Sequence, residues 1–165
     1  MLAAMKTGPP EGAAADAERL LPHFYKDEPP VFATFRTEGT LALPPPAREA
    51  VLERVLREHG QRYAVFALIV MQDHVHLVLQ ALHAERGWPF DTTSILKGLK
   101  EGTELAVRKM LAVSGSVWQE DMFTVELRSQ EALDDKCAWV RQNPVRSKLV
   151  RNPEEYAWLW MSAHV

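Results

Sequence analysis

The pattern of apolar and polar positions predicts alternating strands and helices from residue 31 onward. Residues 47–59 carry apolar side chains at helical spacing, and a longer pattern of the same kind covers residues 93–111. Residues 63–71 are almost all apolar, which is typical of a strand buried on both faces. The other expected elements are strands at residues 31–36, 74–80 and 123–127 and a last helix, capped by Ser129, that ends at Gln142.

The order of these elements, β-α-β-β-α-β-α, predicts an α+β fold. Only Gln72 and Asp73 separate the second and third strands, so we expect these strands to form a hairpin. This mixture favours a ferredoxin-like antiparallel sheet with helices packed on one face. Residues 1–30 are rich in Ala, Pro and Gly, and we expect a weakly ordered N-terminal arm there. The domain itself is then expected to span residues 31–165.

Composition narrows the class of protein. The chain has 165 residues, 47% of them hydrophobic, which suffices for one domain with a core. It carries 19 basic and 22 acidic side chains, so a site for a polyanion has to be a local patch. The single cysteine excludes an internal disulfide and a cysteine-only zinc site. No apolar run is long enough to span a bilayer, and we expect a cytoplasmic protein without a membrane partner.

The most distinctive motif is the His-Val-His run in the third strand. Because alternate side chains of a strand share a face, His74 and His76 are expected to point the same way, while Val75 points to the other face. Two imidazoles at this spacing can hold one divalent cation and leave room for water and phosphate oxygens. The alternative interpretation is that either ring is an ordinary polar group at the surface of a sheet.

Several segments, taken in order, resemble the single-tyrosine HUH transposases, including the REP-associated branch. Residues 71–79 match the Met-x-Asp/Asn-His-Val-His-Leu strand of that family. Residues 115–120 look like its Gly-x-Val/Leu-Trp-Gln element, and residues 141–150 look like its Asn-Pro-Val-basic segment. The resemblance covers roughly residues 31–160. It implies a DNA-binding, transposase-like protein whose partner is single-stranded or hairpin DNA, with Mg²⁺ or Mn²⁺ held by His74 and His76.

The sequence departs from the family at its nucleophile. In the family, a tyrosine on the helix after the motif strand attacks the phosphorus and becomes linked to the 5′ end of the DNA. Here the corresponding stretch is residues 100–103, and Gly102 occupies the expected tyrosine position. A tyrosine at position 102 is expected to project toward the histidine pair. The resemblance therefore implies that covalent tyrosine chemistry is lost, and no catalytic residue is assigned.

A basic strip near the C-terminus is the predicted DNA contact. Residues 141–152 contain four basic side chains and no acid, beside Asn143, and the strip's predicted contacts are Arg141, Asn143, Arg146 and Lys148. Lys97 and Lys100 on the long helix are predicted to extend the same groove. Trp139, on the last helix, is predicted to lie in the core. The alternative for the strip is an ordinary solvated helix end.

Other functions and ligands stay open at this point. One alternative is an active metal-dependent DNA endonuclease or transposase with a relocated nucleophile, for which the candidate tyrosines are Tyr25, Tyr63 and Tyr156. Another is a non-catalytic ferredoxin-like module with no nucleic-acid role. A third metal ligand is not evident, although Glu101 or Glu104 could serve as one. A homodimer is also left open.

Overall fold

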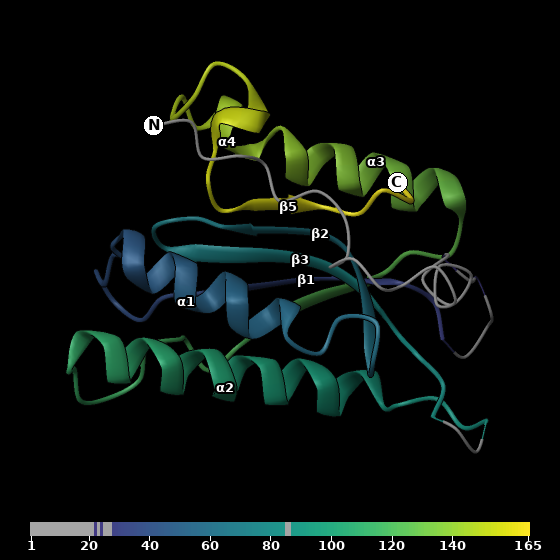
Figure 1. Ribbon diagram of the computed structural model, residues 1–165, viewed down its shortest axis with the longest axis horizontal. Helices are drawn as coiled ribbons and strands as arrows, with labels where there is room; N and C mark the ends of the chain where they lie inside the picture. The colour runs from purple at the N-terminus through teal and green to yellow at the C-terminus, as the bar shows by residue number, and fades with distance from the viewer. Residues whose placement is uncertain (1–21, 23, 25–27, 85–86) are drawn as a thin grey trace.

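A five-stranded antiparallel sheet forms the centre of the computed structural model, which describes residues 22, 24, 28–84 and 87–165 (Figure 1). The strands lie in the order β4-β1-β3-β2-β5. Their bounds are Val31–Arg36 for β1, Tyr63–Val70 for β2, His74–Ala81 for β3, Phe123–Glu126 for β4 and Leu159–Met161 for β5. The predicted hairpin is formed by β2 and β3, and the first four strands have the order of a ferredoxin-like sheet.

Two helices cover one face of the sheet, as predicted. These are α1, Pro45–Leu56, and α2, Thr92–Leu111, which lie side by side against the sheet (Figure 1). Asp91 caps α2, because its side chain accepts a hydrogen bond of 2.7 Å from the Ser94 backbone N–H. The buried apolar residues of β3 on this face are Val75, Leu77, Leu79 and Ala81. The α+β class and the antiparallel sheet with helices packed together on one face are confirmed.

A third helix, α3 (Gln130–Arg141), packs on the opposite face of the sheet (Figure 1). It contributes the buried side chains of Leu133, Cys137 and Val140, whose spacing makes one apolar stripe. Two short helical segments follow, α4 (Asn143–Arg146) and η2 (Pro153–Glu155). No helix was predicted on this second face, so its covering by α3 is a finding of the structure.

The second face is only partly covered. Helix α3 packs mainly on β2, with further contacts to β3 and β5. By contrast, all four residues of β4, at the far edge of the sheet, are exposed. The boundary between the covered and the open part of this face runs along β1 and β3, where the histidine motif lies.

The predicted N-terminal arm, residues 1–30, falls largely outside the described residues. Within the described part of the chain, no helix combines the length and the apolar character needed to cross a membrane.

Candidate functional site

His74 and His76 lie on the face of the sheet that α3 partly covers. Their ring centroids are 4.6 Å apart, so the two rings share one face, as the strand alternation predicts. In the register with β1, Thr34 is opposite His76 and Arg36 is opposite His74. On the other side of β3, Ile69 of β2 is opposite His76.

One nitrogen of each imidazole is already engaged. Nδ1 of His76 lies 2.7 Å from the Thr34 hydroxyl oxygen, and Nδ1 of His74 lies 2.7 Å from a carboxylate oxygen of Asp73. Hydrogen bonds of this kind fix the orientation of a ring and leave Nε2 for another partner. Both imidazoles are thus held in the manner usual for metal-ligating histidines.

His76 is held in its neutral form. His76 is only 6% exposed. Burial is the main cause that lowers its pKa to about 3, and the neighbouring His74, Arg36, Arg146 and Lys136 lower it further. A neutral imidazole is the form that binds a metal ion, so His76 does not need to lose a proton at neutral pH.

Helix α3 places Trp139 against the histidine pair. The ring centroids of Trp139 and His76 are 4.9 Å apart, and those of Trp139 and Phe32 are 5.9 Å apart. Trp139 is nevertheless 40% exposed, so the prediction that it belongs to the core is wrong. It lies outside the apolar stripe of α3, immediately before Val140, and this offset in the sequence is the signal that marks it as a surface residue.

Two cations surround the Trp139 ring. The Arg146 guanidinium lies 4.5 Å from the ring centroid, and Arg146 Nη2 donates a 2.8 Å hydrogen bond to the Trp139 carbonyl oxygen. The Lys136 ammonium lies 5.3 Å from the same ring and 4.6 Å from that of Phe32. We call His74, His76, Lys136, Trp139 and Arg146 the His–Trp cluster. Sequence reasoning found Arg146 but missed Lys136.

Position 102 does not face the histidine pair, so that prediction is wrong. Gly102 lies on α2, on the opposite side of the sheet, against the Arg54 side chain of α1. A Cβ atom built at this glycine would lie 2.6 Å from Arg54 Nε, which explains why a residue without a side chain suits the position. The residue of this turn that is fully buried is Thr103, whose hydroxyl accepts a 3.1 Å hydrogen bond from the Trp118 indole.

The donor set for a metal consists of the two histidines. Glu101 and Glu104, the candidates for a third ligand, belong to α2 and therefore lie on the other side of the sheet. Among the described residues, no group of three or more His, Cys, Asp or Glu side chains is placed to hold a metal ion. Two imidazoles can supply two ligands to a divalent cation, and water or phosphate oxygens would then have to supply the rest.

Tyr63 and Tyr156, the two candidate tyrosines that the structure describes, are not available as nucleophiles near the pair. The Tyr63 hydroxyl donates a 2.6 Å hydrogen bond to the Val55 carbonyl, and the Tyr156 hydroxyl donates one of 3.0 Å to the Val70 carbonyl. Both residues are buried, and burial raises the pKa of Tyr63 to about 12 and also raises the pKa of Tyr156. Tyr25 lies outside the described residues.

The predicted basic strip is divided in the folded chain. Arg141 forms an ion pair with Glu154, which η2 brings back toward α3. Asn143 is buried, and its side-chain oxygen accepts a 3.3 Å hydrogen bond from the Ser147 hydroxyl. Lys148 is exposed. Of the residues predicted to contact DNA, the structure brings only Arg146 next to the histidine pair.

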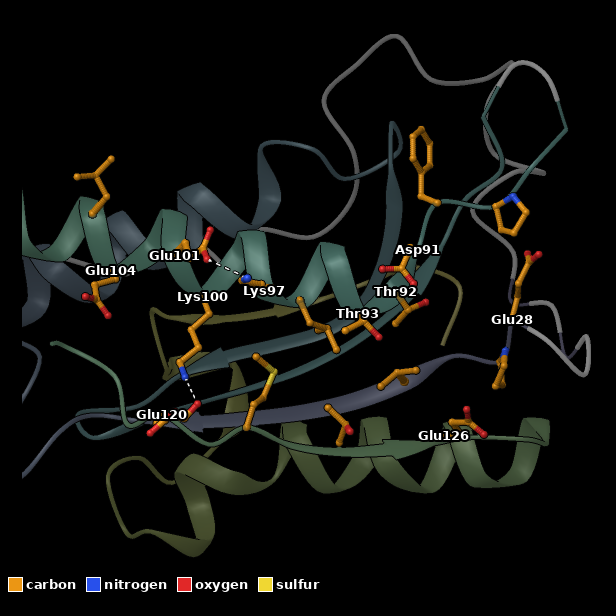
Figure 2. Close-up of a pocket in the computed structure, with 18 of the residues that line it drawn as sticks. Glu28, Asp91, Thr92, Thr93, Lys97, Lys100, Glu101, Glu104, Glu120 and Glu126 are labelled. Atoms are coloured by element: carbon orange, nitrogen blue, oxygen red, sulfur yellow. Dashed lines mark hydrogen bonds and ion pairs between the residues drawn. The ribbon is translucent and has the colours of Figure 1, made fainter.

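Lys97 and Lys100 line a separate groove between α2 and β4, on the other side of the sheet (Figure 2). Lys97 Nζ lies 4.0 Å from a Glu101 carboxylate oxygen, and Lys100 donates a 2.5 Å hydrogen bond to the Glu120 carbonyl. Acidic side chains outnumber basic ones in the lining; they are Glu28, Asp91, Glu101, Glu104, Glu120 and Glu126. This groove does not extend the His–Trp cluster, and its charge does not favour DNA.

Comparisons with known proteins find the fold but no sequence relative. No family model matches the chain, and no curated protein matches it. Among solved structures, a REP-associated tyrosine transposase bound to a REP hairpin has a TM-score of 0.61 and 13% identity over 83% of this chain and 78% of that chain. A protein of Deinococcus radiodurans R1, described as a candidate transposase, has a TM-score of 0.47 and 16% identity over 73% of this chain and 94% of that chain. The first of these likenesses shows that the chain has a transposase-like fold, in agreement with the resemblance in its motifs.

Proposed function

We propose that this transposase-like protein binds single-stranded DNA, or the unpaired part of a hairpin, at the His–Trp cluster. The observation that carries the proposal is the meeting of His76, Trp139 and Arg146 at one point of a transposase-like fold. The solved structure of similar fold is bound to a DNA hairpin, which supports the same class of partner here.

The chemistry of the cluster matches the two parts of a nucleotide. Arg146 and Lys136 supply positive charge for the phosphates, although the chain as a whole is acidic. The exposed Trp139 ring offers an aromatic surface on which an unpaired base can stack. Because base and phosphate belong to the same nucleotide, one strand can meet both within this small area.

A divalent cation, Mg²⁺ or Mn²⁺, is proposed to bind at Nε2 of His74 and His76. Thr34 and Asp73 orient the two rings for this role through their Nδ1 atoms. When bound, such an ion offsets negative charge on a phosphate oxygen. With two protein ligands, the binding is expected to be weak.

Covalent tyrosine chemistry is proposed to be absent. Trp139 is the residue of α3 that meets the histidine pair, and an indole carries no hydroxyl for attack on phosphorus. The buried hydroxyls of Tyr63 and Tyr156 are bonded to backbone carbonyls elsewhere. Strand cleavage by water at the metal stays an alternative, and a non-catalytic module without a nucleic-acid role is the outcome if no DNA binds.

The proposal is tested by fluorescence anisotropy with a labelled single strand and a labelled hairpin at low salt. Arg146→Gln combined with Lys136→Gln should weaken binding and reduce its dependence on salt, because phosphate contacts release counterions. Lys97→Gln combined with Lys100→Gln removes the same charge from the opposite side of the sheet and should change binding much less. Absence of binding by the unmodified protein at low salt overturns the proposal.

A further inference from the structure

Two exposed aromatic rings flank a buried one on the open part of the α3-side face. Phe123 of β4 is 61% exposed, and its ring centroid lies 6.4 Å from that of Phe32. On the other side, the Trp139 centroid lies 5.9 Å from Phe32. Because both distances are measured from the Phe32 centroid, the two exposed rings are no farther apart than these distances combined. Phe32 itself is buried. Neighbouring nucleotides of one strand can span such a separation.

The register of the sheet connects Phe123 to the histidine pair. Thr34 of β1 is the Cα partner of Phe123 on one side and of His76 on the other. The side chains of Phe123, Thr34 and His76 therefore form one row across β4, β1 and β3 on the same face. A strand of DNA lying along this row passes from the exposed edge of the sheet to the His–Trp cluster.

The exposure of Phe123 is not explained by packing. Its neighbour on the same face of β4, Val125, is also exposed, and β4 is an edge strand. Exposed apolar side chains on an edge strand favour unwanted association, so proteins usually replace them with charged residues. Exposed apolar side chains that gather in one area, as Phe123, Val125 and Trp139 do around Phe32, mark a binding surface.

We infer that Phe123 and Trp139 are stacking positions for two unpaired bases of a single DNA strand. This inference rests on the proposed function and deepens it, because it names what the site recognises: the free faces of unpaired bases in addition to phosphates. In a duplex each base face is covered by its neighbours, so these rings have nothing to stack on. The two stacking positions, Phe123 and Trp139, therefore favour binding of unpaired DNA over duplex DNA.

The test compares three labelled probes: a thymidylate strand, the same strand with abasic sites, which keeps the phosphates but has no bases, and a duplex of equal length. Phe123→Leu is the main variant, because it keeps an apolar side chain at an exposed position and removes the ring. Trp139→Leu is the second variant. Trp88→Leu is the matched control, since Trp88 is 78% exposed and lies in the loop after β3, away from the cluster. Thermal unfolding confirms that each variant is folded.

Stacking predicts that Phe123→Leu and Trp139→Leu each weaken binding of the thymidylate strand about fivefold or more. Binding of the abasic strand should stay unchanged in Phe123→Leu, whose ring contacts neither cation, and Trp88→Leu should behave as the unmodified protein does. If Phe123→Leu binds the thymidylate strand with unchanged affinity, the stacking inference is overturned. The proposed function stands after that result if the double variant Arg146→Gln, Lys136→Gln still binds the thymidylate strand more weakly than the unmodified protein. If the unmodified protein binds none of the probes, both are overturned.

Discussion

The two faces of the sheet differ in how completely apolar side chains cover them. On the face under α1 and α2, strand and helix side chains form a continuous apolar core, exemplified by Phe35, which is 1% exposed and packs edge-on against Trp118. On the face under α3, the apolar core reaches only to Phe32 of β1 and gives way to His76, the half-exposed Trp139 and the exposed Arg146. The first face holds the molecule together, and the second leaves side chains free for a ligand.

The largest expected effect is the difference in stability loss between alanine variants of two phenylalanines on neighbouring strands. Phe35→Ala should lower the free energy of unfolding by about 3–5 kcal/mol, because it opens a cavity under α1 and α2. Phe123→Ala, on the open face, should lower it by less than about 1 kcal/mol. Urea unfolding of both variants measures the difference. Equal losses would contradict the division of the sheet into a closed and an open face.

The buried phenol of Tyr63 should make stability depend on alkaline pH. Its folded pKa of about 12 lies above its ordinary value of 10.0, so its stabilising effect is complete below pH 10 and is lost as the pH rises through 12. The expected loss is about 2–3 kcal/mol. Urea unfolding at a series of pH values should show a smaller loss for Tyr63→Phe. A spectroscopic titration of Tyr63 near pH 10 would show instead that this hydroxyl is accessible.

A tyrosine introduced on each side of the sheet tests which of the two faces can bring a phenol to bound DNA. Gly102→Tyr must shift the flexible end of the Arg54 side chain, which pairs with Glu58, and should change the free energy of unfolding by no more than about 1 kcal/mol, because a glycine inside a helix is itself unfavourable. It should form no covalent adduct with DNA. Trp139→Tyr puts a phenol beside His76 and, under the proposed function, is the variant expected to form an adduct with hairpin DNA and Mn²⁺.

A denaturing gel reads out both tyrosine variants. An adduct formed by Gly102→Tyr, with none formed by Trp139→Tyr, would reverse the assignment of the two faces. The unmodified protein is the control and should form none.

Metal binding is expected to give the smallest effect. Calorimetric titration with Mn²⁺ should show weak binding that is lost in His76→Ala, because only one imidazole then remains. His83→Ala is a suitable control, since His83 pairs with Glu28 away from the cluster. Unchanged affinity in His76→Ala would locate the metal elsewhere.

Much of the fold could be predicted from periodicity alone. The apolar spacing in residues 47–59 and 93–111 gave the helices, and alternation in β3 gave the common face of His74 and His76. The same alternation contained the information that the prediction for position 102 overlooked. Val75 and its apolar partners take the face that α2 covers, so the histidines necessarily point away from α2.

The contents of the site could not be predicted in the same way. The stripe formed by Leu133, Cys137 and Val140 shows that α3 is amphipathic, but it does not tell which face of the sheet the helix covers. The approach of Trp139 to His76 depends on that choice. The difference between Arg141 and Arg146 depends on another long-range contact, since η2 brings Glu154 back to pair with Arg141 while Arg146 lies over Trp139.

The central claim, that DNA binds on the α3 side of the sheet, is tested most directly by the indole N–H signals of the tryptophans in a proton–nitrogen NMR spectrum. Trp139→Phe and Trp118→Phe assign the two signals that matter. On addition of a thymidylate strand, the exposed Trp139 signal should shift, while that of Trp118, buried and bonded to Thr103, should stay in place. A shift of Trp118 with an unmoved Trp139, under conditions where the strand is bound, would contradict the account.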